Sequence, residues 1–230
     1  MIYLLYLLNK KRIEDRKSIL INSFKKNRLT KTNGRWILNL VPILILSLFS
    51  TSVFSLLQTA LPLDMVRGGI SRPPISEGWS GTILTIQLFL LVIFQWPIGY
   101  WLSKHKQGFG LFISIFCFCI GCLLLGVSAI WSKGILLILM AQIPLALGLA
   151  AFLPTSTEAI IKTSPIEKRG MAMAIFSQCF ALSALFTPAL AGVIIDQQGH
   201  VMIIWLGMSM GCLTMLPLTK LVRTGSTLQS

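Results

Sequence analysis

The sequence predicts an all-α membrane protein with six transmembrane helices. Only 12% of its 230 residues are charged and its mean hydropathy is +0.78, whereas soluble domains carry roughly 25% charged residues. Six uncharged stretches each reach the ~20 residues that cross the ~30 Å hydrocarbon core of a bilayer. Strands of a membrane barrel would be half as long and would alternate in polarity, which these stretches do not. The predicted spans are residues 36–63, 78–103, 107–132, 134–157, 170–195 and 200–219.

Together the six spans form a predicted bundle over residues 36–219, which is flanked by polar segments on both sides. Residues 1–35 are predicted to be a basic cytoplasmic linker that begins with the remnant of a preceding helix, since about eight apolar residues are too few to cross a bilayer. Residues 220–230 are predicted to be a short cytoplasmic tail. Half of the 20 Lys and Arg residues fall before Trp36. Such a run is typical of a solvated segment near anionic lipid, so we expect no nucleic-acid partner.

The positions of the basic residues predict the orientation in the membrane. With the N-terminus inside, 17 Lys and Arg residues lie on the inner side and 3 on the outer side. Because Lys and Arg are retained on the cytoplasmic side, both termini are predicted to be cytoplasmic, with the chain in the cell membrane. Five tryptophans near the predicted helix ends suit an interfacial belt: Trp36, Trp79, Trp101, Trp131 and Trp205.

Glutamines mark four of the six predicted spans, namely the first, second, fourth and fifth. An amide in hydrocarbon is unfavourable unless it finds a partner or faces water. The sorting therefore predicts a polar cavity that these four helices share. For any single glutamine, an interhelical hydrogen bond is the alternative. The candidate cavity residues are Gln58, Gln87, Gln95, Gln142 and Gln178.

No residue pattern indicates an enzyme. The two histidines, His105 and His200, lie at helix ends, and all five cysteines lie inside apolar spans without metal-ligand spacing. We therefore predict no catalytic residue, no metal site and no cofactor. Glu158 is identified as the one acid close to a helix interior. It is assigned to an ion pair near Lys104 and Arg169, with a proton-coupling carboxylate as the alternative.

Three local patterns resemble those of the major facilitator superfamily. In the loop after the second span, Gly99 ends a helix, Ser103 stands where the family has an Asp, and basic residues follow from Lys104. A Pro-x-x-x-Arg-Gly loop that contains Arg169 joins the fourth and fifth spans. In the fifth span, small residues and a proline follow the family's glycine pattern and predict close helix packing: Ser183, Thr187, Pro188 and Gly192.

Over residues 36–219 the chain thus resembles the C-terminal six-helix half of a bacterial transporter of this superfamily. The resemblance implies a 3+3 inverted repeat, a cavity lined by the first, second, fourth and fifth helices, and a second six-helix half as partner. That partner is an N-terminal half or a second copy, and the chain itself is expected to be a truncated or split protein.

The function predicted in this way is secondary transport of a small uncharged or amphipathic solute by alternating access, with efflux of a drug or metabolite as one form of it. The absence of charge in the middle of any span indicates an uncharged or amphipathic solute, or else a charged partner on the other six-helix half. The alternative is a non-transporting membrane scaffold or assembly factor on the same fold.

Overall fold

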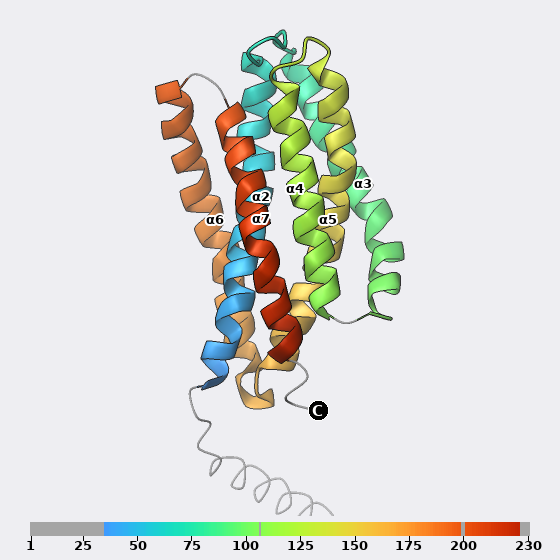
Figure 1. Cartoon of the computed structure of the whole chain (residues 1–230), viewed down its shortest axis with the longest axis vertical. Helices are drawn as coiled ribbons and strands as arrows, with labels where there is room; N and C mark the ends of the chain where they lie inside the picture. Colours follow the sequence, from blue (N-terminus) through green and yellow to red (C-terminus); the bar gives the residue numbers. More distant parts are fainter. Residues whose placement is uncertain (1–34, 106, 199–200, 226–230) are drawn as a thin grey trace, which may run out of the picture. The chain divides into compact units, whose positions relative to one another are not determined.

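The computed structural model describes residues 35–105, 107–198 and 201–225, which form long helices and contain no strand (Figure 1). Six of these helices are long and apolar enough to cross a membrane, which confirms the predicted fold class. The inverted repeat stays a prediction. The helices are α2 (Arg35–Arg67), α3 (Glu77–Leu102), α4 (Gln107–Ser128), α5 (Gly134–Thr163), α6 (Arg169–Gln198) and α7 (Met202–Gly225), with a 3₁₀ turn at Ile166–Lys168.

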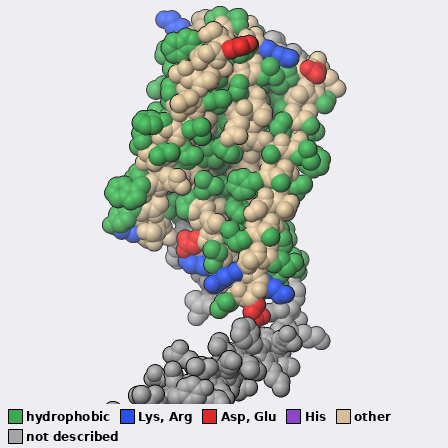
Figure 2. All heavy atoms as spheres, turned by 180° about the vertical axis from the view of Figure 1, so that it is seen from behind, with side chains coloured by type: hydrophobic (Ala, Val, Ile, Leu, Met, Phe, Trp, Pro, Cys, Tyr) green, Lys and Arg blue, Asp and Glu red, His purple; other side chains and the backbone are tan. Residues whose placement is uncertain are grey.

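Most helices extend beyond the predicted spans, and α5 reaches Thr163 rather than residue 157. α2 continues past residue 63 to Arg67, and α7 continues past residue 219 to Gly225. The predicted linker lies outside the described residues apart from Arg35, as does the end of the predicted tail. Figure 2 shows charged side chains near the ends of the helices, while the middle of that face carries none. This distribution is the one that a bilayer core requires.

Among the packed helix pairs, α4 lies against α5 and α7, while α3 lies against α5. Glycines allow the approach of α4 and α5. A Cβ atom on Gly148 would lie 2.9 Å from the Phe118 ring, and one on Gly121 would lie 2.4 Å from Leu145. Without a hydrophobic drive between helices in lipid, such contacts between small residues and neighbouring side chains supply the van der Waals attraction that holds the helices together.

Hydroxyl groups join α2 to α6. The Thr51 Oγ1 and Ser183 Oγ atoms are 2.7 Å apart, and the Ser183 hydroxyl also donates to the Leu48 carbonyl at 3.1 Å. Ser183 is 2% exposed, so the position predicted for helix packing forms a buried interhelical hydrogen bond. Such bonds contribute on average ~0.6 kcal/mol each in membrane proteins.

A buried ion pair holds the ends of several helices together. Arg72, in the loop between α2 and α3, lies 3.0 Å from Asp64 near the end of α2, and both side chains are at most 2% exposed. Arg72 also donates to the Ser128 hydroxyl at the end of α4 and to the Asp64 carbonyl, each at 2.8 Å. The Trp205 indole N–H, at the start of α7, donates to Asp64 Oδ2 at 3.3 Å. The cluster therefore connects three helices and one loop.

The loop between α2 and α3 is fastened by its backbone as well. Ser71 N–H donates to the Ala129 carbonyl at 3.0 Å, and Gly69 approaches Ala129 so closely that a Cβ atom would lie 2.6 Å from its Cα. Gly68 has a φ of +82°, a left-handed conformation that glycine adopts without strain. This loop accordingly lies directly on the turn between α4 and α5.

These contacts correct two sequence predictions. Glu158 is not the one acid close to a helix interior, because Asp64 lies inside α2 and is buried with Arg72. Trp205 does not belong to an interfacial belt, because it is 0% exposed and bonds to Asp64. By contrast, Trp79 and Trp131 are 60% and 57% exposed, as interfacial residues should be.

We expect Asp64→Asn to lower the free energy of unfolding by about 3–5 kcal/mol, because it leaves the Arg72 guanidinium buried without a counter-charge. The matched control is Glu158→Gln, which removes an acid from a pair that is about half exposed and should change stability by at most about 1 kcal/mol. Reversible unfolding in mixed micelles measures both. Equal effects of the two substitutions would contradict the structural role of the Asp64–Arg72 pair.

The orientation predicted from charge can be tested at two exposed isoleucines in loops at opposite ends of the helices. Ile70 is 54% exposed and Ile166 is 80% exposed. In a background without native cysteines, a membrane-impermeant thiol reagent added to intact cells should label Ile70→Cys and not Ile166→Cys. Permeabilised cells serve as the control, since both thiols should then react. The reverse pattern in intact cells would overturn the topology.

Candidate functional site

A small pocket lies within the membrane-embedded part of the bundle. Its volume is about 40 Å³, and no charged side chain lines it. Residues from α2, α3, α5 and α6 form its walls, and none comes from α4 or α7. These are the four helices for which the glutamines predicted a shared cavity. The lining residues are Ser50, Thr51, Phe54, Leu91, Leu149, Phe152, Leu153 and Phe180.

Ser50 is the unusual polar group of this pocket. The neighbouring hydroxyls of Ser47 and Thr51 donate to backbone carbonyls one turn earlier, at 2.7 and 2.8 Å. The Ser50 hydroxyl is fully buried and has no hydrogen-bond partner. A buried unpaired polar group costs about 1–3 kcal/mol. The site therefore keeps one unsatisfied hydroxyl in an apolar setting.

Aromatic rings form much of the remaining wall. Phe152 and Phe180 line the pocket from α5 and α6, and Phe176 lies between them. Its ring centroid is 6.5 Å from that of Phe152 and 5.4 Å from that of Phe180, with an edge-on geometry in the second pair. Edge-to-face contacts at these distances are favourable and keep the rings in place.

Three of the predicted glutamines lie on the same helix faces as pocket residues. Gln87 and Gln95 are four residues before and after Leu91 on α3, and Gln58 is four residues after Phe54 on α2. Residues four apart lie on one face, about 6 Å apart along the axis. Gln87 is 4% exposed, while Gln58 and Gln95 are exposed. The amide of Gln58 on α2 therefore lies roughly one turn from the pocket. On α3, Gln87 and Gln95 lie about one turn to either side of it.

The remaining two glutamines differ in their surroundings. Gln142 is buried on α5, and its amide donates to the Ile138 carbonyl of the same helix at 3.0 Å, while its Oε1 has no partner. It lies seven residues before Leu149, hence on the pocket side of α5. Gln178 is exposed and only two residues from Phe180, so it lies on another side of α6. The cavity role of all five glutamines stays a prediction.

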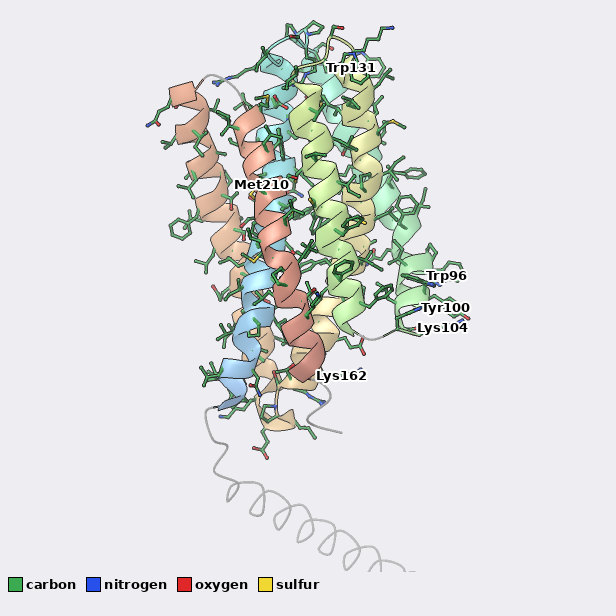
Figure 3. The ribbon with its side chains drawn as sticks, viewed as in Figure 1. Trp96, Tyr100, Lys104, Trp131, Lys162 and Met210 are labelled. Carbon is green, nitrogen blue, oxygen red and sulfur yellow. The ribbon has the colours of Figure 1, made fainter. Side chains whose placement is uncertain are left out.

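The predicted motif after α3 forms a tight local turn. Ser103 N–H donates to the Gly99 carbonyl at 3.0 Å, and its hydroxyl donates to the Tyr100 carbonyl. The Lys104 ammonium lies 4.2 Å from the centroid of the Tyr100 ring. Figure 3 shows Trp96, Tyr100 and Lys104 projecting from the end of α3 away from the other helices.

This part of α3 carries a broad, open groove of about 570 Å³, lined by Val92, Gln95, Trp96, Gly99 and Tyr100. All five lining residues belong to α3, so no other helix among the described residues closes the groove. Trp96 is 84% exposed. The groove is therefore part of a face that the described part of the chain leaves uncovered.

The charged residues predicted to bridge the loops are found in local contacts. Glu158 pairs with Lys162 one turn later on α5, at 2.5 Å. Arg169 Nε, at the start of α6, donates to the Ile161 carbonyl near the end of α5 at 3.2 Å. Arg169 thus does join α5 to α6. The contact of Glu158 with Lys104 or Arg169 stays a prediction.

Of the small residues predicted to pack α6, Ser183 bonds to α2 as described above. Thr187, Pro188 and Gly192 are partly buried, and a Cβ atom on Gly192 would meet nothing within 4 Å. The close approach predicted at these three positions stays a prediction. Within the described part of the chain, no group of three or more His, Cys, Asp or Glu residues could hold a metal ion.

Six helices that are long and apolar enough to cross a membrane, four of which line an uncharged pocket, define the class of a multi-pass membrane protein. The family model described as Major Facilitator Superfamily matches residues 16–228, so the chain belongs to this superfamily. No curated protein and no solved structure matches it. Members of this superfamily are transporters rather than enzymes. A transporter of this fold lies in the lipid bilayer and has a small solute as its substrate.

Proposed function

We propose that the chain supplies one six-helix half of a secondary transporter that moves a small uncharged or amphipathic solute across the plasma membrane by alternating access. The observation that carries this proposal is the pocket shared by α2, α3, α5 and α6. A solute site at the middle of the membrane, facing the interface between two halves, is the arrangement in which one half rocks against the other.

The location of the buried charges supports an uncharged solute. Asp64 lies 14 residues after Ser50 on α2, which corresponds to about 21 Å along the helix. Its carboxylate is paired with Arg72. A charged solute would need a counter-charge inside the membrane, and the residues that line the pocket supply none.

Uncovered polar and aromatic faces support a second half. α3 and α6 are the two least buried of the six spans. They carry the exposed amides of Gln95 and Gln178, and α3 carries the open groove at Trp96. Amides that face hydrocarbon without partners are unfavourable. An N-terminal half or a second copy of the chain would cover these faces and close the cavity. The proposed orientation has both termini in the cytoplasm, according to the distribution of basic residues.

We expect the monomeric chain not to transport. Monomer and dimer fractions, and a complex with a separately expressed N-terminal half, would each be reconstituted in liposomes and tested with a panel of uncharged fluorescent aromatic solutes. Flux above protein-free liposomes is expected only from a two-half assembly. Flux from a strictly monomeric preparation would contradict the proposal, and absence of flux from every assembly would favour a scaffold role.

In the assembled transporter, Leu153→Trp should reduce flux at least tenfold, because a Trp side chain would fill the pocket. Leu153 is partly exposed and lines the pocket, so the larger side chain has room to be accommodated without unfolding. Leu123→Trp, at a 48% exposed position of α4, is the matched control and should leave flux unchanged. Equal flux from the two variants would place the solute elsewhere.

A further inference from the structure

The open groove on α3 lies along one side of a single helix. Its lining residues follow one another at steps of three and four, which places them on one face of the helix: Val92, Gln95, Trp96, Gly99 and Tyr100. Figure 3 shows Trp96 and Tyr100 projecting away from the other helices. Between Gln87 and Leu102, α3 has no buried residue. This groove face thus has the form of a helix-packing surface that no other described helix covers.

Glycines show where the helices of the chain pack and where they do not. On α4, α5 and α7, a Cβ atom added to any of five glycines would lie within 3 Å of a neighbouring side chain: Gly110, Gly121, Gly126, Gly148 and Gly211. By contrast, a Cβ atom on Gly81 or Gly99 of α3, or on Gly192 of α6, would meet nothing within 4 Å. Glycine is unfavourable inside a helix unless a close approach uses it. Unused glycines on the two least buried spans therefore indicate a further helix that packs there.

The polar group of the groove face distinguishes a helix from lipid as its occupant. Gln95 is exposed there, and an amide that faces acyl chains without a partner is unfavourable. Acyl chains carry no hydrogen-bonding group, whereas the side chains of a packed helix supply one. Trp96, which is 84% exposed, and Tyr100 lie beside Gly99 on this face. A large apolar side chain of a second helix would therefore fill the space over Gly99.

Charge distinguishes a different partner from a second copy of the chain. In the predicted orientation, 17 basic and 4 acidic residues lie on the inner side, and 3 of each lie on the outer side. The net charge of +13 thus lies wholly on the inner side. Two copies in the same orientation bring their inner sides together, and like charges across an interface are unfavourable.

The inner ends of the two uncovered helices show the same imbalance. At the end of α3, the Lys104 ammonium lies 4.2 Å from the centroid of the Tyr100 ring of the groove face. At the start of α6, Lys168 and Arg169 outnumber Glu167. A second copy would oppose Lys104 with a net positive helix end, whether its α3 or its α6 faced the groove. A partner with a carboxylate at that height complements Lys104 instead.

We propose that the groove face docks a membrane-spanning helix of a different six-helix unit, and not of a second copy of this chain. That helix places a large apolar side chain over Gly99 and a carboxylate beside Lys104, with a hydrogen-bonding group near Gln95. The inference rests on the proposed function, because it names the kind of partner that completes the transporter.

The test is photo-crosslinking of the full 230-residue chain in membranes of its native host, with p-benzoylphenylalanine in place of Trp96. Ultraviolet light should join the chain to a second polypeptide, and peptide mass mapping should place the adduct on a span with an Asp or Glu at its inner end. Gly99→Leu and Lys104→Glu should each lower the adduct yield about fivefold or more. Lys104→Arg keeps the charge and should retain the yield, as should Gly207→Leu, at a glycine of α7 that also meets nothing. The same label in place of Leu123, which is 48% exposed on α4, should give no such adduct.

An adduct between two copies, an adduct with lipid alone, or no adduct would overturn the inference, as would equal yields from Lys104→Glu and Lys104→Arg. Docking is read without flux, so the interface and the transport function can fail separately. A unit that docks as described but transports nothing in liposomes would retain the interface and lose the transport function. Flux from an assembly that gives no adduct at Trp96 would retain transport and place the partner on another face.

Discussion

The ion pair between Asp64 and Arg72 is the interaction on which the arrangement of the helix ends depends. Both charges are buried, so each would be strongly unfavourable without the other. Arg72 also donates to the Ser128 hydroxyl and to the Asp64 carbonyl, and the Trp205 indole donates to the second carboxylate oxygen of Asp64, while Arg72 Nε has no partner. Since these four residues come from three helices and a loop, completing the cluster brings the C-terminal ends of α2 and α4 beside the N-terminal end of α7. The position of α2 fixed in this way also sets the depth of Ser50 in the membrane.

The helices divide into a tightly packed group and a group with uncovered faces. α4 and α5 approach through Gly121 and Gly148, where close van der Waals contact replaces the hydrophobic drive that lipid removes. α3 and α6 are the least buried spans, and α6 is joined to α2 by the bond between Thr51 and Ser183. The pocket lies where the two groups meet, with walls from α2 and α5 as well as from α3 and α6. The pocket therefore borders both the packed helices and the helices with the least buried faces.

Hydropathy alone predicted the six spans, because a bilayer admits only helices with their backbone groups bonded internally. The sorting of glutamines predicted the four helices that line the pocket, although its lining residues include none of the five glutamines. The ion pair was missed because a charge was taken to end a span at residue 63, whereas α2 runs to Arg67. Opposite charges eight residues apart, at Asp64 and Arg72, were the available signal. Trp205 was misplaced because only its position near a helix end was considered. Its burial depends on contact with Asp64, which is 141 residues away in the sequence.

The chemistry of the pocket follows from what a membrane interior tolerates. An unpaired hydroxyl is unfavourable there, but an unpaired charge is far more so. The chain follows this order: its buried charges are paired near the end of α2, and the group left without a partner beside the pocket is the Ser50 hydroxyl.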